Sequence, residues 1–234
     1  MRIFGFLLMF VCTSAYPEEI RVLSGGAAKS FIDPLAASFA GHTVKIEYQP
    51  MGRLTRSLAE GYPADMIVVT SEVLESLKLK GTPIARVGIG VAVHEKAPLP
   101  DISSAEAFKR TLLAAKSIVY IDPKTGTSGK HVAEILKKLN IYEEMNGKTI
   151  LGQGGYVTEP VGRGEIEFGI HQISEILPVK GVKLAGPLPP ELQKYTVYVA
   201  VNMKNNSAVK EFISYLGGPT AKIRLPQAGY TSPE

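Results

Sequence analysis

Residues 117–139, SIVYIDPKTGTSGKHVAEILKKL, decide the fold. The first five residues, 117–121, form an apolar, β-branched run that predicts a buried strand. Residues 122–129 are rich in Asp, Pro, Gly, Thr and Ser, which favour turns. Apolar side chains then recur at helical spacing, at Val132, Ile135, Leu136 and Leu139. The stretch therefore predicts a strand, a loop and a helix in direct succession.

Such a loop directs free backbone N–H groups, and the positive end of a helix dipole, toward whatever lies above it. Gly126 lets the backbone approach a ligand closely, and Thr125, Thr127 and Ser128 offer hydroxyl donors. These features predict an anion site. A plain connection in a parallel sheet is the alternative that the stretch alone leaves open. The loop lacks the spacing of a P-loop, so phosphate-transfer chemistry is not indicated.

The first fifteen residues have the pattern of a secretory signal peptide. Arg2 precedes an apolar run over 3–11, small residues follow, and cleavage is expected after Ala15. The run is too short to span a bilayer, so we expect a periplasmic protein. Cys12 is the one cysteine; it leaves lipidation as an alternative, although no small residue precedes it. The mature chain would then depend on its core rather than on disulfides.

Composition narrows the classes of partner. Hydrophobic residues make up 45% of the chain, enough for a sizeable core or two lobes, and the formal net charge is +4. Basic residues are scattered, so we expect no nucleic acid partner. The weak positive charge suits a small anionic ligand better. We find no metal-binding cluster or cofactor loop in the sequence; we expect no metal, no cofactor and a monomer.

Strands and helices alternate along the chain. The pattern predicts an α/β protein with two lobes, each a mostly parallel sheet flanked by helices. Lobe one is assigned 16–88 and 195–234, and lobe two 89–194, with crossing strands near 88–94 and 195–201. Ligands of such sheets bind at the carboxyl ends of the strands. Strands are expected at 20–24, 44–48, 64–69, 87–93, 117–121, 148–151, 168–172, 182–185 and 195–201, and the last helix at 208–216.

Four segments carry a family resemblance, in the same order along the chain. They are Gly61-Tyr-Pro-Ala-Asp-Met-Ile-Val68, Leu77-Lys-Leu-Lys-Gly81, the loop 122–129, and Gly186-Pro-Leu-Pro-Pro-Glu-Leu192. Together they resemble the molybdate-type periplasmic substrate-binding proteins of ABC importers. The resemblance implies a type II periplasmic-binding fold, a small anion as ligand, and the membrane subunits of an ABC importer as partners.

The chain departs from that family where the ligand is expected. Molybdate-binding members have serines at the first two helix N-termini, where this chain has Ala27 and Met51, and Gln172 replaces a tyrosine. Planar carboxylates favour a side-chain amide or an arginine fork, so we expect a small di- or tricarboxylate rather than a molybdate-like oxyanion. Segments 88–93 and 169–175 resemble a divergent branch that includes periplasmic aconitate isomerases.

The expected binding site combines backbone amides with a few polar side chains. Arg53 and Arg86 are the favoured carboxylate clamps, Tyr156 could close over a ligand, and Lys29 is expected to be solvated. The full expected set is Gly26, Ala27, Met51, Gly52, Arg53, Arg86, Thr125, Gly126, Thr127, Ser128, Tyr156, Val157 and Gln172.

Two classes of function remain open on the sequence. Capture and delivery of an anion needs only two lobes, a hinge and converging donors, and it is the more economical hypothesis. An aconitate isomerase-like enzyme also needs an acid/base group, for which Glu175, Tyr156 and His171 are the candidates. The two-residue period of a strand places His171 opposite Gln172, so we expect His171 in the core or at an edge. A secreted adhesin has no supporting feature.

Overall fold

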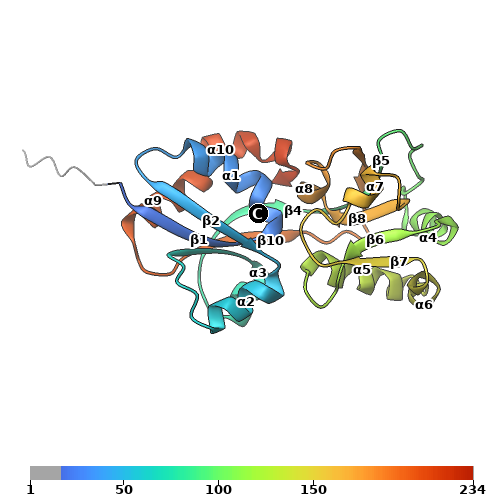
Figure 1. Ribbon diagram of the computed structural model, residues 1–234, viewed down its shortest axis with the longest axis horizontal. Coiled ribbons are helices and arrows are strands. Elements are labelled where there is room, and N and C mark those ends of the chain that lie inside the picture. Colours follow the sequence, from blue (N-terminus) through green and yellow to red (C-terminus); the bar gives the residue numbers. More distant parts are fainter. Residues whose placement is uncertain (1–16, 234) are drawn as a thin grey trace, which may run out of the picture.

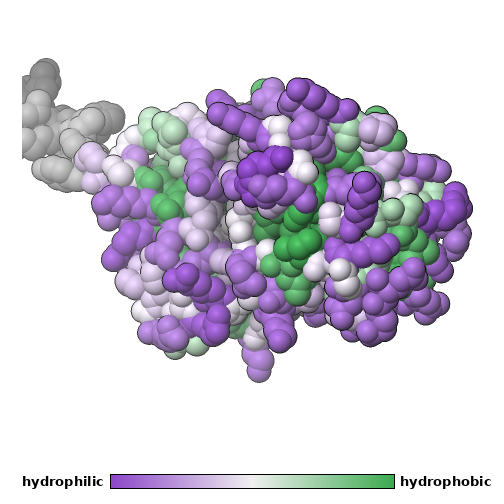
Figure 2. Space-filling view, turned by 45° about the vertical axis from the view of Figure 1, so that its right-hand side comes forward, coloured by the Kyte–Doolittle hydropathy of each residue, from purple (hydrophilic) through white to green (hydrophobic). Residues whose placement is uncertain are grey.

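The computed structural model describes residues 17–233; the predicted signal peptide therefore lies outside the described residues. The chain forms a six-stranded and a five-stranded sheet, which lie side by side with helices on their faces (Figure 1). We call the first sheet with its helices the first lobe, and the second sheet with its helices the second lobe. Figure 2 shows a mostly hydrophilic surface, with hydrophobic residues gathered in a band near the middle of that face.

The first sheet has the order β11-β4-β10-β3-β1-β2. β1 pairs parallel with β2 and β3, whereas β10 pairs antiparallel with β3 and β4, and β11 pairs antiparallel with β4. All five residues of β3 are buried, because helices cover both faces of the sheet. The strands are β1 Glu19–Gly25, β2 Thr43–Gln49, β3 Met66–Thr70, β4 Thr82–Val87, β10 Thr196–Asn202 and β11 Tyr230–Thr231.

The second sheet has the order β7-β6-β8-β5-β9. β6 pairs parallel with β7 and β8, while β5 pairs antiparallel with β8 and β9. The strands are β5 Ile89–His94, β6 Ile118–Ile121, β7 Thr149–Gly152, β8 Phe168–Gln172 and β9 Val182–Pro187. Each sheet is therefore mixed, rather than mostly parallel as predicted, because strands that enter from the other lobe pair antiparallel.

Helices cover both faces of the first sheet, with α1, α9 and α10 on one side and α2 and α3 on the other (Figure 1). Each lobe has its own apolar core, built from buried strand and helix residues. The helices are η1 Gly26–Ala28, α1 Lys29–Ser38, α2 Met51–Ala59, α3 Ser71–Ser76, α4 Ala105–Ala114, α5 Thr127–Lys138, α6 Tyr142–Asn146, α7 Glu159–Gly162, α8 Ile173–Ile176, α9 Ser207–Leu216, α10 Pro219–Arg224 and η2 Pro226–Ala228.

The chain passes between the lobes at two places that are tied together. The first crossing is at Gly88, between β4 and β5, and the second is at 188–195, between β9 and β10. The side chain of Gln193 accepts from the backbone N–H of Ile89 at 2.9 Å and donates to its carbonyl at 2.8 Å. One side chain thus holds the two crossing segments together.

The prediction of an α/β fold with two helix-flanked sheets is confirmed, and the expected strands all form. One predicted strand, 87–93, is in fact two, since β4 and β5 meet at Gly88 and lie in different sheets. Pro83 lies near the start of β4, so the first half of this strand lacked a clear β pattern. The helix at 208–216 is not the last helix, because α10 follows it.

Gly129 allows α5 to pack directly on β6. A Cβ atom at this position would overlap the carbonyl oxygen of Ile121, the last residue of β6. We therefore expect Gly129→Ala to lower the free energy of unfolding by about 1–3 kcal/mol or more, as overpacking of a core does. Urea denaturation followed by circular dichroism measures this change.

Gly147→Ala is the matched control, because a Cβ at Gly147 meets no heavy atom within 4 Å and its φ is −70°. Its stability should stay within about 1 kcal/mol of the wild type. Equal effects of the two substitutions would contradict the packing argument.

Candidate functional site

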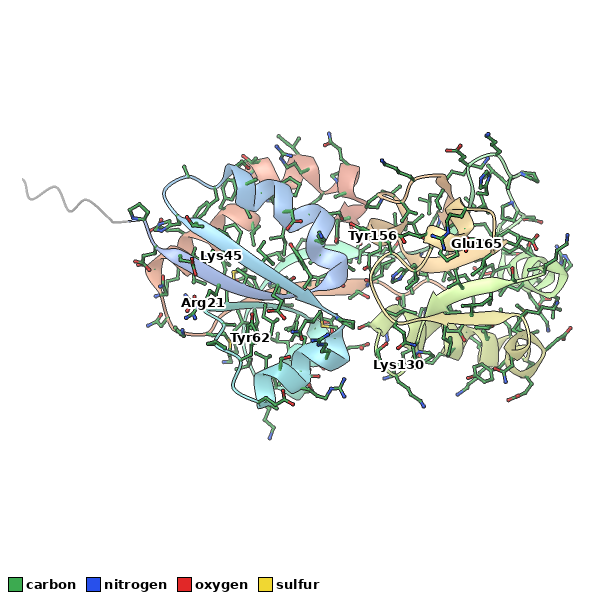
Figure 3. All side chains as sticks on the ribbon, in the orientation of Figure 1. Arg21, Lys45, Tyr62, Lys130, Tyr156 and Glu165 are labelled. Atoms are coloured by element: carbon green, nitrogen blue, oxygen red, sulfur yellow. The ribbon has the colours of Figure 1, made fainter. Side chains whose placement is uncertain are left out.

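A cavity of about 310 Å³ lies between the two lobes. Figure 3 shows Tyr156 at this junction, whereas Glu165 belongs to the second lobe and lies away from the junction. The cavity lining is contributed by both lobes and includes backbone, hydroxyl, amide, aromatic and charged groups. It comprises Gly26, Ala27, Lys29, Tyr48, Gln49, Pro50, Met51, Ile121, Gly126, Thr127, Ser128, Gly154, Gly155, Tyr156, His171, Gln172, Glu175 and Tyr198.

Three helical segments begin at this cavity without a side-chain cap. The turn η1 that leads into α1 begins at Gly26, α2 begins at Met51, and α5 begins at Thr127. The residues before them, Gly25, Pro50 and Gly126, make no side-chain capping hydrogen bond. The first backbone N–H groups of a helix have no partner within the helix, so these starts offer donors to a ligand.

Three of the helices that begin away from the cavity, α3, α4 and α9, have a side-chain cap, whereas α6, α7 and α10 have none. The side chains of Thr70, Ser104 and Asn206 accept from backbone N–H groups in the first turns of α3, α4 and α9, at 3.4, 3.2 and 3.2 Å. Capping side chains of this kind are the usual acceptors at a helix start. Their absence at α2, α5 and η1 leaves room for an acceptor from outside the chain.

Gln172 places an unpaired donor in the cavity lining. Its side chain is 3% exposed, and its Oε1 accepts from the hydroxyl of Tyr198 at 3.1 Å. That bond fixes which end of the amide is the donor. The other end, Nε2, has no hydrogen-bond partner. A buried amide N–H without a partner is rare, so this group is suited to an acceptor on a bound molecule.

Ser128, His171 and Glu175 form a buried hydrogen-bonded chain beside this amide. Ser128 Oγ lies 3.0 Å from His171 Nδ1, and Glu175 Oε2 lies 3.0 Å from His171 Nε2. The carbonyl of Gly155 is a longer contact, 3.4 Å from Nε2. All three side chains are buried and line the cavity. The order serine, imidazole, carboxyl makes this chain able to pass or hold a proton.

Burial sets the protonation of this chain. It raises the pKa of Glu175 to about 8 and lowers the pKa of His171 to about 4. At neutral pH the carboxyl group is therefore protonated and the imidazole is neutral, so the pair is a neutral hydrogen bond. Lys29 is then the charged side chain in the cavity lining, with its Nζ 5.6 Å from the ring centroid of Tyr48. A neutral Glu175 leaves the cavity with a positive charge balance, which favours an anion.

The lobes meet around the cavity mouth. The backbone N–H of Gly52, in the first turn of α2, donates to the carbonyl of Thr125 in the second lobe at 3.4 Å. On another side, the hydroxyl of Ser174 donates to the carbonyl of Ala27 at 3.0 Å. The structure is thus a closed arrangement of the two lobes.

Most of the residues expected to bind ligand come together here. The expected residues that line the cavity are Gly26, Ala27, Met51, Gly126, Thr127, Ser128, Tyr156 and Gln172, together with the catalytic candidates His171 and Glu175. Gly52 and Thr125 lie outside the lining and instead contact each other at the mouth. Val157 packs into a small apolar core of the second lobe.

The two arginines expected as clamps lie outside the cavity lining. Arg53 is exposed on α2. Arg86 is half-buried in β4, where its guanidinium lies 4.6 Å from the ring centroid of Tyr195 and its Nε donates to Thr231 at 3.2 Å. These contacts place Arg86 beside the crossing segments rather than beside the cavity.

His171 differs from the expectation that it faces away from Gln172, since both line the cavity. The period of two fails because Gln172 is the last residue of β8 and the N-cap of α8, where the chain changes direction. Lys29 is exposed, as expected, and it also lines the cavity, as do Tyr48, Gln49 and Tyr198. Tyr48 and Gln49 end β2, so their place at a strand's carboxyl end was the available signal.

Residues 20–231 match the family described as bacterial extracellular solute-binding protein. The chain belongs to this family.

This solute-binding protein is 29% identical to an aconitate isomerase of a Pseudomonas species, over 90% of this chain and 86% of that one. It is 24% identical to the molybdate-binding protein ModA of Rhodobacter capsulatus, over 96% and 94% of the two chains. Its fold matches the periplasmic molybdate-binding protein of Azotobacter vinelandii with a TM-score of 0.74, at 18% identity over 92% of this chain and 100% of that one.

Two kinds of feature are absent from residues 17–233. Within them, no group of three or more His, Cys, Asp or Glu side chains is placed to hold a metal ion. No helix in the same range is both long and apolar enough to cross a membrane.

The buried pair makes the stability of this solute-binding protein pH-dependent. From about pH 6.5 to pH 8 the folded state holds the Glu175 proton and the unfolded state does not, while His171 is neutral in both. The free energy of unfolding should therefore fall as pH rises through this window, by about 1.4 kcal/mol per pH unit. Below about pH 6.5, the lowered pKa of His171 has the opposite effect on the free energy of unfolding and offsets this decline.

Urea denaturation at a series of pH values measures this effect. Glu175→Gln should flatten the decline, because the amide does not titrate. Glu165→Gln should leave it unchanged, since Glu165 is exposed and pairs with Arg163. A wild-type protein with constant stability from about pH 6.5 to pH 8 would contradict the assignment of a protonated Glu175.

Proposed function

We propose that this protein captures a small di- or tricarboxylate in the cavity between its lobes, in the periplasm, and delivers it to the membrane subunits of an ABC importer. The unpaired Nε2 of Gln172 is the observation that carries the proposal. A buried donor of this kind needs an acceptor, and a carboxylate oxygen supplies one. Extracellular solute-binding relatives support the location and the transport role.

The charge of the cavity supports an anion. Lys29 contributes a positive charge, and the helix starts at Met51 and Thr127 contribute backbone donors. With Glu175 protonated, no carboxylate of the lining opposes a negative ligand. Donors at helix N-termini bind anions without any arginine, so the outward placement of Arg53 and Arg86 is compatible with the proposal.

The apolar parts of the lining support a ligand with a carbon skeleton. Ala27, Met51 and Ile121 present hydrocarbon surface, and Tyr48 and Tyr156 present aromatic rings. A bare tetrahedral oxyanion has no apolar surface to contact these groups, and it gains most from a ring of neutral donors. A carboxylate on a short carbon chain uses both kinds of surface. The relatives named for molybdate binding support the broader class of small anions.

An isomerase is the second candidate, and the chain Ser128–His171–Glu175 favours it. Moving a proton between carbons next to carboxylates needs an acid/base group close to the bound ligand. Here a carboxyl with a raised pKa is connected through an imidazole to a hydroxyl in the cavity lining. The relative named as an aconitate isomerase supports the same substrate class.

One set of samples tests both candidates. Thermal melts with molybdate, tungstate, citrate, cis-aconitate and trans-aconitate should show the largest stabilisation for a carboxylate, about 2.7 kcal/mol at a hundredfold excess over its dissociation constant. Proton NMR of the same aconitate samples then reports interconversion of the two isomers. Tight binding of molybdate with no effect of any carboxylate would overturn the proposal, and interconversion would identify the enzyme.

Gln172 gives a sharper test of the site. Gln172→Leu removes the amide donor while keeping a similar volume, so we expect carboxylate affinity to fall at least tenfold, about 1.4 kcal/mol. Isothermal titration calorimetry with citrate or trans-aconitate measures the change. Gln227→Leu is the control, since Gln227 is exposed and lies outside this cavity; wild-type affinity of the Gln172 variant would show that the amide does not contact the ligand.

A further inference from the structure

We propose that Glu175 is a positioning residue for the binding site: its proton fixes the tautomer of His171 and thereby makes the hydroxyl of Ser128 a donor to the ligand. When Glu175 ionises, the same chain turns Ser128 into an acceptor and the site loses its preference for anions. This inference deepens the proposed function and rests on it for the identity of the ligand class.

The geometry allows one direct path between these groups. The two ring nitrogens of His171 lie 3.0 Å from Glu175 Oε2 and 3.0 Å from Ser128 Oγ. His171 and Ser128 are 1% and 3% exposed, so water does not compete freely for these bonds. Ser128 also lies in the first turn of α5 and lines the cavity, which brings its hydroxyl to the place where the ligand binds.

The protonated carboxyl dictates the direction of every bond in the chain. Its O–H donates to Nε2 of His171, so the neutral ring carries its own proton on Nδ1. Nδ1–H then donates to Ser128 Oγ. Because the Oγ is already an acceptor from the ring, its own proton is available to a ligand in the cavity. Ser128 therefore acts together with the amide of Gln172 as a donor.

Loss of the Glu175 proton to solvent reverses each bond. The ring remains neutral but now carries its proton on Nε2, from which it donates to the carboxylate. The carbonyl of Gly155, 3.4 Å from Nε2, is a second acceptor that favours this tautomer. Bare Nδ1 then accepts the proton of Ser128 Oγ, which presents only lone pairs to the cavity. An anion loses a donor and meets a carboxylate charge behind it.

The tyrosines around Glu175 do not titrate together with it, so the proton of Glu175 controls the switch. Tyrosine hydroxyls face it from three other segments, with Tyr156 in the loop before α7, Tyr198 in β10 and Tyr230 in β11. Burial raises the pKa of each tyrosine, so all three stay neutral when Glu175 titrates. Lys29 is the cationic side chain in the same cavity lining.

The donors of Gln172 and Ser128 discriminate between ligands by their protonation. A fully ionised carboxylate offers an acceptor to Gln172 Nε2, to Ser128 Oγ–H and to the helix amides. A ligand that retains an acidic proton can place that donor opposite Gln172 Nε2 or Ser128 Oγ–H, and one of the two donors then lacks an acceptor. The inferred selectivity is therefore for fully deprotonated anions.

Ligand-free NMR tests the switch itself. In protein with ¹⁵N-labelled histidine, His171 assigned with a His171→Gln variant should show Nδ1 protonated near neutral pH and Nε2 protonated above about pH 8. Glu175→Gln should remove this pH-dependent exchange, and Glu165→Gln should keep it. A His171 tautomer that does not change with pH in the wild type overturns the inference, whether or not any carboxylate binds.

Calorimetry tests the effect on binding, with citrate as the probe because its carboxylates are ionised above about pH 7. Wild-type affinity should fall at least tenfold between about pH 7 and pH 9.5, and Glu175→Gln should show a flat profile. Ser128→Ala should bind more weakly at pH 7 and lose most of the pH dependence. If Ser128→Ala retains the full fall, charge repulsion by Glu175 is sufficient and the role of Ser128 is overturned.

The two measurements separate this inference from the proposed function. A tautomer change in the free protein with no citrate or aconitate binding at any pH would overturn the carboxylate function and the ligand selectivity, while the hydrogen-bond switch would stand. Citrate binding with the same affinity from about pH 7 to pH 9.5 would support the function and overturn the switch.

Discussion

Backbone N–H groups at the start of a helix must find acceptors, and this requirement organises the molecule. The segments before η1, α2 and α5 supply none from their side chains, and all three open onto one cavity. Two of these starts belong to the first lobe and one to the second. A ligand with several acceptor oxygens can therefore satisfy donors on both lobes at once, which is how a small molecule can hold two separate cores together.

The cavity has its charge balance because one carboxyl group is buried. Glu175 lies beside a neutral imidazole and three tyrosines, and no cation among residues 17–233 contacts it to hold it ionised. An exposed glutamate in the same place would repel the anion that the helix starts attract. Burial of the carboxyl and attraction of a ligand are thus two results of the same packing between α8, β8 and the first lobe.

The fold could be predicted from the sequence because its signals are local. Alternating strands and helices, and glycine-bearing turns such as that at Gly126, identified an α/β protein with two lobes and the segments around its cavity. The arginines could not be placed in this way, since the contact of Arg86 with Tyr195 joins residues more than a hundred positions apart. The same limit applies to the chain Ser128–His171–Glu175, because Ser128 comes from a different segment than His171 and Glu175, and no local pattern indicated that the two segments meet.

The order of strands in the first sheet has a consequence for biosynthesis. β10 is the partner of both β3 and β4 in the sheet, yet it follows the whole second sheet along the chain. During synthesis, β3 and β4 therefore lack the strand that lies between them until β10 has been made. The strands of the second sheet are contiguous in sequence, so they can pair before that. Pairings between distant segments form slowly, so the emerging chain exposes an unpaired edge of β3 until its last forty residues are made. This topology leaves the edge of β3 open to pairing with other chains during synthesis.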